Sequence, residues 1–322
     1  MAMTTALTAA VLFALPKLLG IPEGTIDSGG GGVTVRVQPP VLVIKSGRVR
    51  AFQDVADAFQ ERCRVRVQQV YIGENAGPSF EMRERMQTAQ VLVAVGQPAM
   101  DALQGVRAHV VYALAPDPPS GVIGTNSIAT PLAAFRAITQ LRPSIKRIGV
   151  IFSARAAARM QLARVAAKSL GLELIERQVA NSPEAIRAIH SMIQSAAEGA
   201  PGSPGAVPID ALWVGPDPQL VDTQVLHFLQ QVQIEWRIPV LAGTRQLVSS
   251  GALLAVDWSP EVVGQHLAWQ VNHLLDDPDH IELLSRDHPL APPETVVNVQ
   301  AARRLGISLE SVRGLPNWKL VE

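Results

Sequence analysis

Short apolar runs alternate with helical patterns along the first half of the chain, beginning at Val41. The apolar runs are VLVIKS (41–46), RVRVQQVYI (64–72), QVLVAVGQ (90–97) and HVVYALA (109–115). Between the first two runs, Val55 and Phe59 fall on one face of a predicted helix. Strands that are apolar on both faces are typical of parallel sheets covered by helices. This half therefore predicts a doubly wound α/β lobe.

A second block with the same alternation begins near Arg147. Its apolar runs are RIGVIFS (147–153), LELIERQVA (172–180), IDALWVG (209–215), IPVLAG (238–243) and ALLAVDW (252–258). Gly171 closes one predicted helix, and Ser182 is expected to cap another ahead of Pro183. A further helix is predicted from about residue 218 to 232. Two such blocks predict an α/β fold of two doubly wound parallel-sheet lobes.

The amino-acid composition and the net charge exclude some classes of binding partner. The chain has 322 residues, 48% of them hydrophobic and 17% charged, which suits two domains with buried cores. The 28 basic and 28 acidic residues balance to a net charge of zero, so we expect no nucleic-acid partner, because phosphate binding needs a clustered positive field. Aromatic residues make up 4% of the chain, which also disfavours a platform for stacking bases.

The sequence contains no pattern typical of a metal, a cofactor or a nucleophilic enzyme. Cys63 is the single cysteine, and the seven histidines show no HExxH spacing, so we expect no metal site. No GxGxxG follows the first strand, and neither GxxxxGK[ST] nor GxSxG occurs, so no cofactor is expected. The histidines at 190, 227, 266 and 273 lie within predicted helices and not at strand ends. We therefore expect a protein that is not an enzyme.

The N-terminal segment leaves two interpretations open. The apolar run from Ala6 to Gly20 is too short for a membrane span and is similar to the core of a secretory signal. MAMTT before it contains no Lys or Arg, however, and a surface-packed helix is the alternative. SGGGGV (28–33) is typical of a flexible tether. We predict a signal and tether over 1–38 and a periplasmic or extracytoplasmic location, with a cytoplasmic one as the alternative.

Small, polar and acidic residues follow the predicted strands at their carboxyl ends. Ligands of parallel α/β sheets bind beyond these ends, and two facing lobes place the site in the cleft between them. The predicted ligand-binding residues are Ser46, Gly47, Gly96, Gln97, Asp117, Ser153, Asp217, Asp257 and Trp258.

Helix capping is the alternative role for several of these residues. Ser46, Gly96 and Ser153 precede predicted helices, where free N–H groups favour an anion such as a carboxylate. The two serines could equally serve only as caps. Asp217 followed by Pro218 is typical of a helix N-cap with proline in the first turn.

Asp257 is expected to be free of capping, because Ser259 followed by Pro260 is the better cap for the next helix. Its carboxylate could bind a ligand ammonium group or pair with an arginine. The neighbouring Trp258 offers an amphipathic face to a ligand, although a packing role fits the sequence as well.

A series of segments resembles a known family. In chain order they are QVLVAVGQPAMDAL, KRIGVIFS, AAKSLGLELIE, IDALWVGPDPQLVD, IPVLAGTRQLVSSGALLAVDWSPEVVGQHLAWQVNHLL and VNVQAARRLGISL. Together they are similar to the type I periplasmic solute-binding proteins of ABC importers, in the subgroup that includes tryptophan and tyrosine binders. The resemblance implies two lobes that close by hinge motion over a small-molecule ligand, with a membrane permease as partner.

The resemblance also implies lobes built from discontinuous stretches of the chain. We expect the first lobe to comprise 39–120 and 258–287, and the second 121–257 and 288–322. An amino acid is one candidate ligand. The alternative function is a ligand-sensing or interaction module that keeps the fold without transport, and a cytoplasmic location would favour it.

Overall fold

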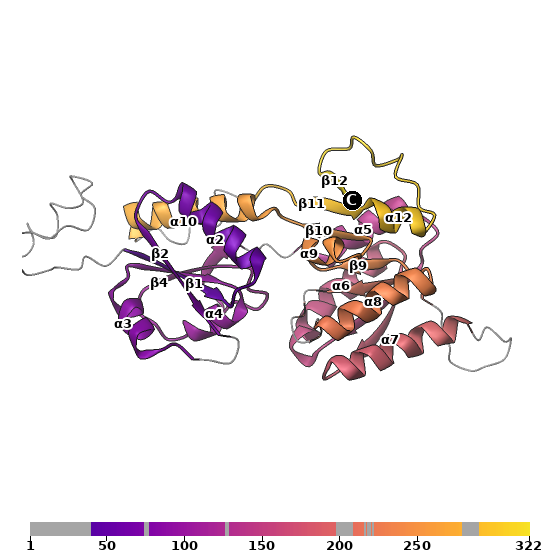
Figure 1. Ribbon diagram of the computed structural model, residues 1–322, viewed down its shortest axis with the longest axis horizontal. Coiled ribbons are helices and arrows are strands. Elements are labelled where there is room, and N and C mark those ends of the chain that lie inside the picture. Colours follow the sequence, from indigo (N-terminus) through magenta and orange to yellow (C-terminus); the bar gives the residue numbers. More distant parts are fainter. Residues whose placement is uncertain are drawn as a thin grey trace, which may run out of the picture.

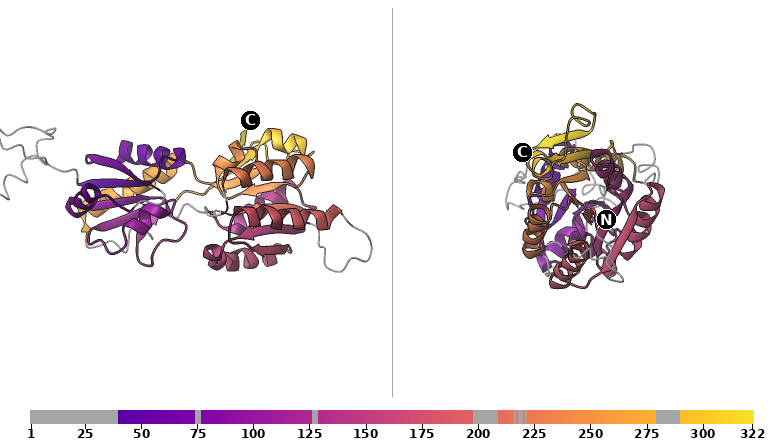
Figure 2. Two further views of the ribbon diagram at one scale, coloured as in Figure 1. Left: turned by 60° about the horizontal axis from the view of Figure 1, so that its bottom comes forward. Right: turned by 90° about the vertical axis from the view of Figure 1, so that its right-hand side faces the viewer.

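A computed structural model describes residues 40–73, 77–125, 129–197, 209–215, 217, 220, 222–278 and 290–322, without the side chains of 194–197. Two β-sheets covered by helices form two lobes that lie side by side along the long axis (Figures 1 and 2). This arrangement confirms the predicted fold class. The predicted signal and tether over 1–38 lie outside the described residues.

The first lobe contains a five-stranded sheet in the order β2-β1-β3-β4-β5, and all of its strand pairs are parallel. Its strands are β1 (Val41–Ser46), β2 (Val67–Ile72), β3 (Val91–Val95), β4 (His109–Ala113) and β5 (Ile123–Thr125). The helices between them are α2 (Arg50–Arg62), α3 (Phe80–Thr88) and α4 (Gln97–Ala102). Every residue of the central strands β1 and β3 is buried, as expected for strands covered on both faces.

Helix α10 (Pro260–Asp276) reaches the first lobe from much later in the chain and packs against α2 (Figure 1). A Cβ atom on Gly264 would lie 2.6 Å from Cβ of Ala58, so only glycine permits this close approach of the two helices. Asn272 then binds the end of α2. Its Nδ2 donates to the carbonyl of Arg62 (3.1 Å), and its Oδ1 accepts the N–H of Arg64 (3.0 Å).

The second lobe contains a seven-stranded sheet in the order β12-β11-β10-β9-β8-β6-β7. Its strands are β6 (Arg147–Phe152), β7 (Glu173–Gln178), β8 (Ala211–Val214), β9 (Val240–Ala242), β10 (Leu254–Asp257), β11 (Glu294–Asn298) and β12 (Trp318–Val321). Its helices are α5 (Pro131–Leu141), the 3-10 turn η1 (Ala154–Ala156), α6 (Ala157–Ser169), α7 (Ser182–Ala197), α8 (Thr223–Glu235), α9 (Arg245–Ser249) and α12 (Val299–Arg304). Strand β11 runs antiparallel to β10, and every other pair is parallel.

Two of the predicted helix starts are wrong. Helix α8 begins at Thr223 and not near residue 218, because the carboxylate of Asp222 accepts the N–H of Val225 (2.9 Å). Asp217 therefore does not cap it. Helix α7 is capped by Asn181 and not by Ser182: the Asn181 side chain accepts the N–H of Glu184 (3.0 Å). The predicted helix end at Gly171 is confirmed by its φ of +65°.

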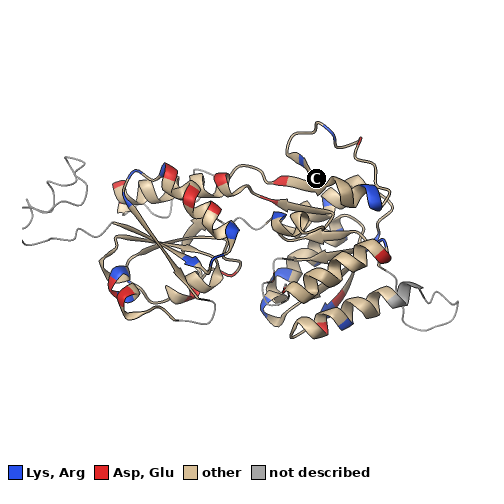
Figure 3. Ribbon diagram, viewed as in Figure 1, with Lys and Arg blue, Asp and Glu red and all other residues tan. Residues whose placement is uncertain are grey.

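The chain crosses between the lobes after β5, between β10 and α10, and between α10 and β11. The first predicted boundary, at residue 120, falls before β5. Since β5 pairs with β4 in the first sheet, the first lobe extends to Thr125. Acidic and basic residues are interspersed over both lobes (Figure 3).

Candidate functional site

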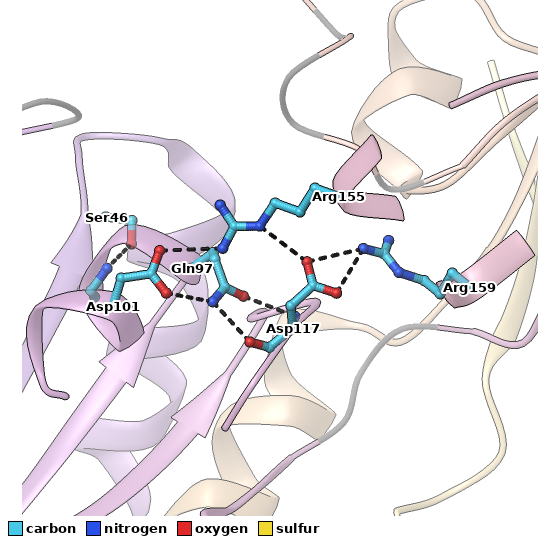
Figure 4. A network of polar contacts seen from close by, with 7 residues as sticks. Ser46, Gln97, Asp101, Asp117, Arg155 and Arg159 are labelled. Carbon is cyan, nitrogen blue, oxygen red and sulfur yellow. Dashed lines mark hydrogen bonds and ion pairs between the residues drawn. The ribbon is translucent and has the colours of Figure 1, made fainter. Parts of the chain in front are cut away.

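Charged side chains from both lobes meet beyond the carboxyl ends of β3, β4 and β6 (Figure 4). The first lobe contributes Asp101 and Asp117, and the second contributes Arg155 and Arg159; we call these four residues the cross-lobe cluster. Arg155 donates to Asp117 Oδ2 and to Asp101 Oδ2, both at 3.3 Å. Arg159 Nη2 lies 3.2 Å from Asp117 Oδ1 and 3.4 Å from its Oδ2. These contacts show that the strand ends of the two sheets face each other.

The side chain of Gln97 holds the two acids of the cluster in place. The backbone N–H of Asp117 donates to Gln97 Oε1 (2.9 Å), and Gln97 Nε2 donates to the Asp117 carbonyl (3.0 Å). The same Nε2 donates to Asp101 Oδ1 (2.8 Å). Gln97 is buried and begins α4, so it fixes the spacing of both carboxylates from a rigid position.

Ser46 and Gly96 lie at the start of α4. Ser46 Oγ accepts the N–H of Ala99 in the first turn of α4 (2.8 Å), so Ser46 caps a helix far along the sequence. The alternative that it caps the helix after it is wrong, since α2 begins behind Val49 without a side-chain cap. Gly47 donates its N–H to the carbonyl of Ile72 (2.8 Å) and joins the ends of β1 and β2.

Ser153 and Asp217 lie together at the end of β6. The N–H of Ser153 donates to Asp217 Oδ2 (2.8 Å), so the carboxylate binds the start of η1 and not the start of α8. Ser153 Oγ is buried and has no hydrogen-bond partner among the described residues. A buried hydroxyl without a partner is costly, which makes Ser153 a candidate donor to a bound molecule.

Asp257 and Trp258 lie at a crossing between the lobes. Asp257 Oδ2 accepts the N–H of Arg245, the first residue of α9 (2.9 Å), and Oδ1 accepts the N–H of Trp258 (2.8 Å). Arg245 also pairs with Glu294 (2.9 Å), which lies opposite Asp257 in the β10–β11 register. The expectation that Asp257 is free of capping is therefore wrong for α9. Ser259 does cap α10, as predicted, by accepting the N–H of Val262.

The Asp257 carboxyl group gives a prediction for stability against pH. Burial raises its pKa from 3.8 to about 6, against the opposing effect of Arg245 and the backbone N–H groups. The folded protein then binds this proton more tightly than the unfolded chain between about pH 4 and 6. The unfolding free energy should fall as pH rises through that window, by at most about 3 kcal/mol for this group.

Urea unfolding of the wild type and Asp257→Asn at pH 4, 5, 6 and 7 measures this difference. Asparagine keeps an oxygen acceptor but does not titrate, so the fall with pH should be smaller in the variant. Equal slopes in the two proteins would contradict the assignment.

Two cavities open in the described part of the chain. A cavity of about 350 Å³ opens at the amino ends of the second-lobe strands and contains none of the predicted site residues; its lining includes Arg142, Trp236 and Arg237. A cavity of about 630 Å³ lies beside β4 and β5, and of the predicted residues it contacts Asp117. The first cavity lies away from the cross-lobe cluster, and the second borders it at Asp117. We place the candidate site at the cross-lobe cluster, where side chains of both lobes converge.

The structure brings together some of the predicted site residues and separates others. Ser46, Gly96, Gln97 and Asp117 lie in one hydrogen-bonded unit, whereas Asp257 and Trp258 contact residues of the crossing instead. Sequence reasoning missed Asp101, Arg155 and Arg159. The spacing ARAAAR directly after a strand was an available signal, because it puts two guanidinium groups one turn apart.

Within the described ranges, no three His, Cys, Asp or Glu side chains are grouped so that they could hold a metal ion. None of the described helices is long and apolar enough to cross a bilayer.

No protein-family model matches the sequence, and no curated protein matches it significantly. Solved structures do match. The ABC domain bound to L-Trp from Streptococcus pneumoniae superposes with a TM-score of 0.65 at 15% identity, over 87% of this chain and 99% of that one. A ligand-free, open substrate-binding protein with adhesive properties from Clostridium difficile gives 0.65 at 16% identity, over 88% and 98%. The chain has the fold of the ABC-transporter solute-binding proteins.

Other structures with this solute-binding-protein fold agree. An ABC sugar transporter subunit from Rhodobacter sphaeroides gives a TM-score of 0.52 at 13% identity, over 80% of this chain and 98% of that one. The high coverage shows that the likeness extends over both lobes. At these identities it establishes the fold and leaves the bound molecule open.

Proposed function

We propose that this chain is the solute-binding component of an ABC importer and binds a small molecule between its lobes. The observation that carries the proposal is the cross-lobe cluster. Asp117 from the first lobe and Arg159 from the second contact each other at the strand ends, which is where parallel α/β sheets bind ligands. A molecule at this point would contact both lobes and would link binding to their relative position.

The polar residues around the cluster support a small, charged or strongly polar solute. Gln97 and Asp117 present amide and carboxylate groups, and Ser153 presents a hydroxyl group without a partner among the described residues. An amino acid is our first candidate, and one protein of the same fold is bound to L-Trp. The remaining predicted ligand-binding residues, Ser46, Gly47, Gly96, Asp217, Asp257 and Trp258, stay part of the proposal.

Binding without catalysis fits the chemistry of the cluster. Its four charged groups are two carboxylates and two guanidinium groups, and these include no nucleophile held by a base. The proposal includes an extracytoplasmic location and a membrane permease as partner, supported by the fold shared with ABC-transporter proteins.

A thermal-shift screen of the purified protein with amino acids, sugars and nucleosides tests the proposal. A ligand at about 100 times its Kd stabilises the folded state by about 2.7 kcal/mol, which corresponds to a rise in Tm of about 5–20 °C for lobes of this size. We expect at least one compound to produce such a rise. Failure of every compound in the three classes would make transport of those classes untenable. Recovery of the native protein from the cytoplasm would instead favour a sensing or interaction module.

A further inference from the structure

The cavity of about 350 Å³ in the second lobe combines an apolar wall with arginine side chains. It opens at the amino ends of β6, β8 and β9, so it lies at the opposite edge of the sheet from the cross-lobe cluster. Its apolar wall consists of four buried isoleucines, Ile145, Ile193, Ile209 and Ile238. Pockets that bind small molecules typically have volumes of about 300–1,000 Å³, and this cavity falls at the lower end of that range.

Two arginines line the same cavity and have no partner among the described residues. Arg142 directly follows α5, and Arg237 lies two residues after the end of α8. An arginine near a helix C-terminus often donates to the last carbonyl groups of that helix. Within the described ranges, neither side chain makes such a hydrogen bond or an ion pair. Both guanidinium groups therefore keep their donors for another acceptor.

The carboxylate of Asp210, which also lines the cavity, is already occupied. Its Oδ2 accepts the backbone N–H groups of Lys146 and Arg147, both at 2.8 Å. Its Oδ1 lies 3.7 Å from Nη2 of Arg147. Because Arg147 balances this acid, Arg142 and Arg237 give the cavity a positive charge that an anion would neutralise.

The backbone of Arg237 is strained. Its φ is +54°, in the left-handed region, and it directly follows the C-cap residue of α8. Glycines occupy the same position after α6, α9 and α12, namely Gly171, Gly251 and Gly306. Glycine adopts this conformation without strain, whereas an arginine does not. Strained residues cluster at functional sites, so the side chain of Arg237 is expected to have a role beyond closing α8.

Trp236 adds an aromatic surface to the cavity. Its ring is held by an edge contact with His190, with ring centroids 6.2 Å apart and an angle of 89°, and by Phe228 at 6.1 Å. Its indole N–H donates to no acceptor among the described residues. A bound molecule would therefore meet a fixed aromatic face with a free donor.

We propose that this cavity is a second ligand site, which binds a small organic anion with its charged group on Arg142 and Arg237 and its apolar body against Trp236 and the isoleucines. The proposal goes beyond the solute between the lobes and does not depend on it. Guanidinium groups bind carboxylates and phosphates through paired hydrogen bonds. A sugar would leave both guanidinium groups without an anion, and an inorganic anion would leave the apolar wall in contact with water.

Solution NMR of the tryptophan indole N–H groups tests the site, with Trp236→Phe to assign the signal of Trp236. Phenylpropionate and phenyl phosphate are the probes, and they distinguish a carboxylate from a phosphate. We expect at least one of them to move the Trp236 signal with a Kd of about 1 mM or tighter. Phenylpropanol, which lacks the charge, and acetate, which lacks the apolar body, should each bind at least about tenfold more weakly. A signal that neither anion moves at about 10 mM, or that phenylpropanol moves equally well, would overturn the proposal.

Variants assign the charged group to its partners. Arg142→Gln and Arg237→Gly should each weaken binding of the anion by about tenfold or more. Arg237→Gly should nevertheless unfold at the same temperature as the wild type or a higher one, because glycine removes the backbone strain. A lower Tm would give Arg237 a stabilising role and would contradict the strain argument.

Arg187→Gln is the matched control. Arg187 is exposed on α7 and does not line the cavity, so its replacement removes the same charge from the same lobe and should change the Kd by no more than about twofold. Equal weakening in this control, or an unchanged Kd in both cavity variants, would overturn the assignment. Arg155→Gln separates this site from the proposed function: a loss of anion binding in that variant alone would place the anion at the cross-lobe cluster instead.

Discussion

A Gly96→Val protein should lose about 3–5 kcal/mol of unfolding free energy, from left-handed strain, overpacking and a lost helix cap. Gly96 has a φ of +93°, which a β-branched residue rarely adopts. An added Cβ would lie 2.6 Å from Ser46 Oγ and 2.9 Å from Phe52 Cζ. The clash displaces the hydroxyl that caps α4, and with it the helix that carries Gln97.

Gly47→Val is the control for backbone strain alone. Gly47 has a similar φ of +80°, but a Cβ there would meet no heavy atom within 4 Å. It should cost about 1–2 kcal/mol. Urea denaturation followed by hydrogen exchange in first-lobe peptides measures both variants. Equal losses would show that crowding around Ser46 contributes nothing.

A Gly264→Val protein is expected to lose about 3 kcal/mol, through overpacking between α10 and α2. An added Cβ would lie 2.6 Å from Cβ of Ala58 and 2.7 Å from both the Phe59 nitrogen and the Val55 oxygen. Two of these atoms belong to the backbone of α2, so rotation of a side chain cannot relieve the clash. The two helices must separate, and the fit of α10 on the first lobe is lost.

Gln265→Val places the same side chain one residue along, on the exposed face of α10. It should change the unfolding free energy by no more than about 0.5 kcal/mol. The same denaturation and hydrogen-exchange measurements apply, with first-lobe peptides expected to lose protection in Gly264→Val alone. A first lobe in Gly264→Val as protected as in the wild type would contradict the packing of α10 on α2.

The two-sheet fold could be predicted because each buried strand can be recognised from its own residues. Strands β1 and β3 are apolar on both faces, and that pattern alone indicates a strand buried between layers of helices. The antiparallel direction of β11 could not be predicted, because strand direction depends on how the crossing after α10 returns to the second sheet.

Hydrogen-bond partners were harder to predict than elements. The sequence offers Ser46 as a cap for the helix that follows it, but β1 and β3 are neighbours in the sheet, and this places Ser46 beside the start of α4. Asp217 precedes a proline and carries a capping signal, yet Asp222 has the spacing that reaches the N–H of Val225. Tertiary proximity decides the case of Ser46, and local spacing does not reveal it, whereas the case of Asp217 depends on where α8 begins.

Only part of the candidate site could be predicted from the sequence. Gln97 and Asp117 follow strands and were found by that rule, because strand ends in a parallel sheet share an edge. Asp101, Arg155 and Arg159 were missed because they lie inside helical segments and not directly at strand ends. Their role depends on contacts with side chains of the other lobe. A pattern along one chain segment does not report contacts between segments that fold into different lobes.

A crystal structure of the complex with the best-binding compound tests the central claim most directly. We expect the solute between the lobes at the cross-lobe cluster, in contact with side chains of both lobes and with the direct Arg159–Asp117 contact broken. A solute enclosed within a single lobe, for example in the cavity beside β4 and β5, with that contact intact, would contradict the account.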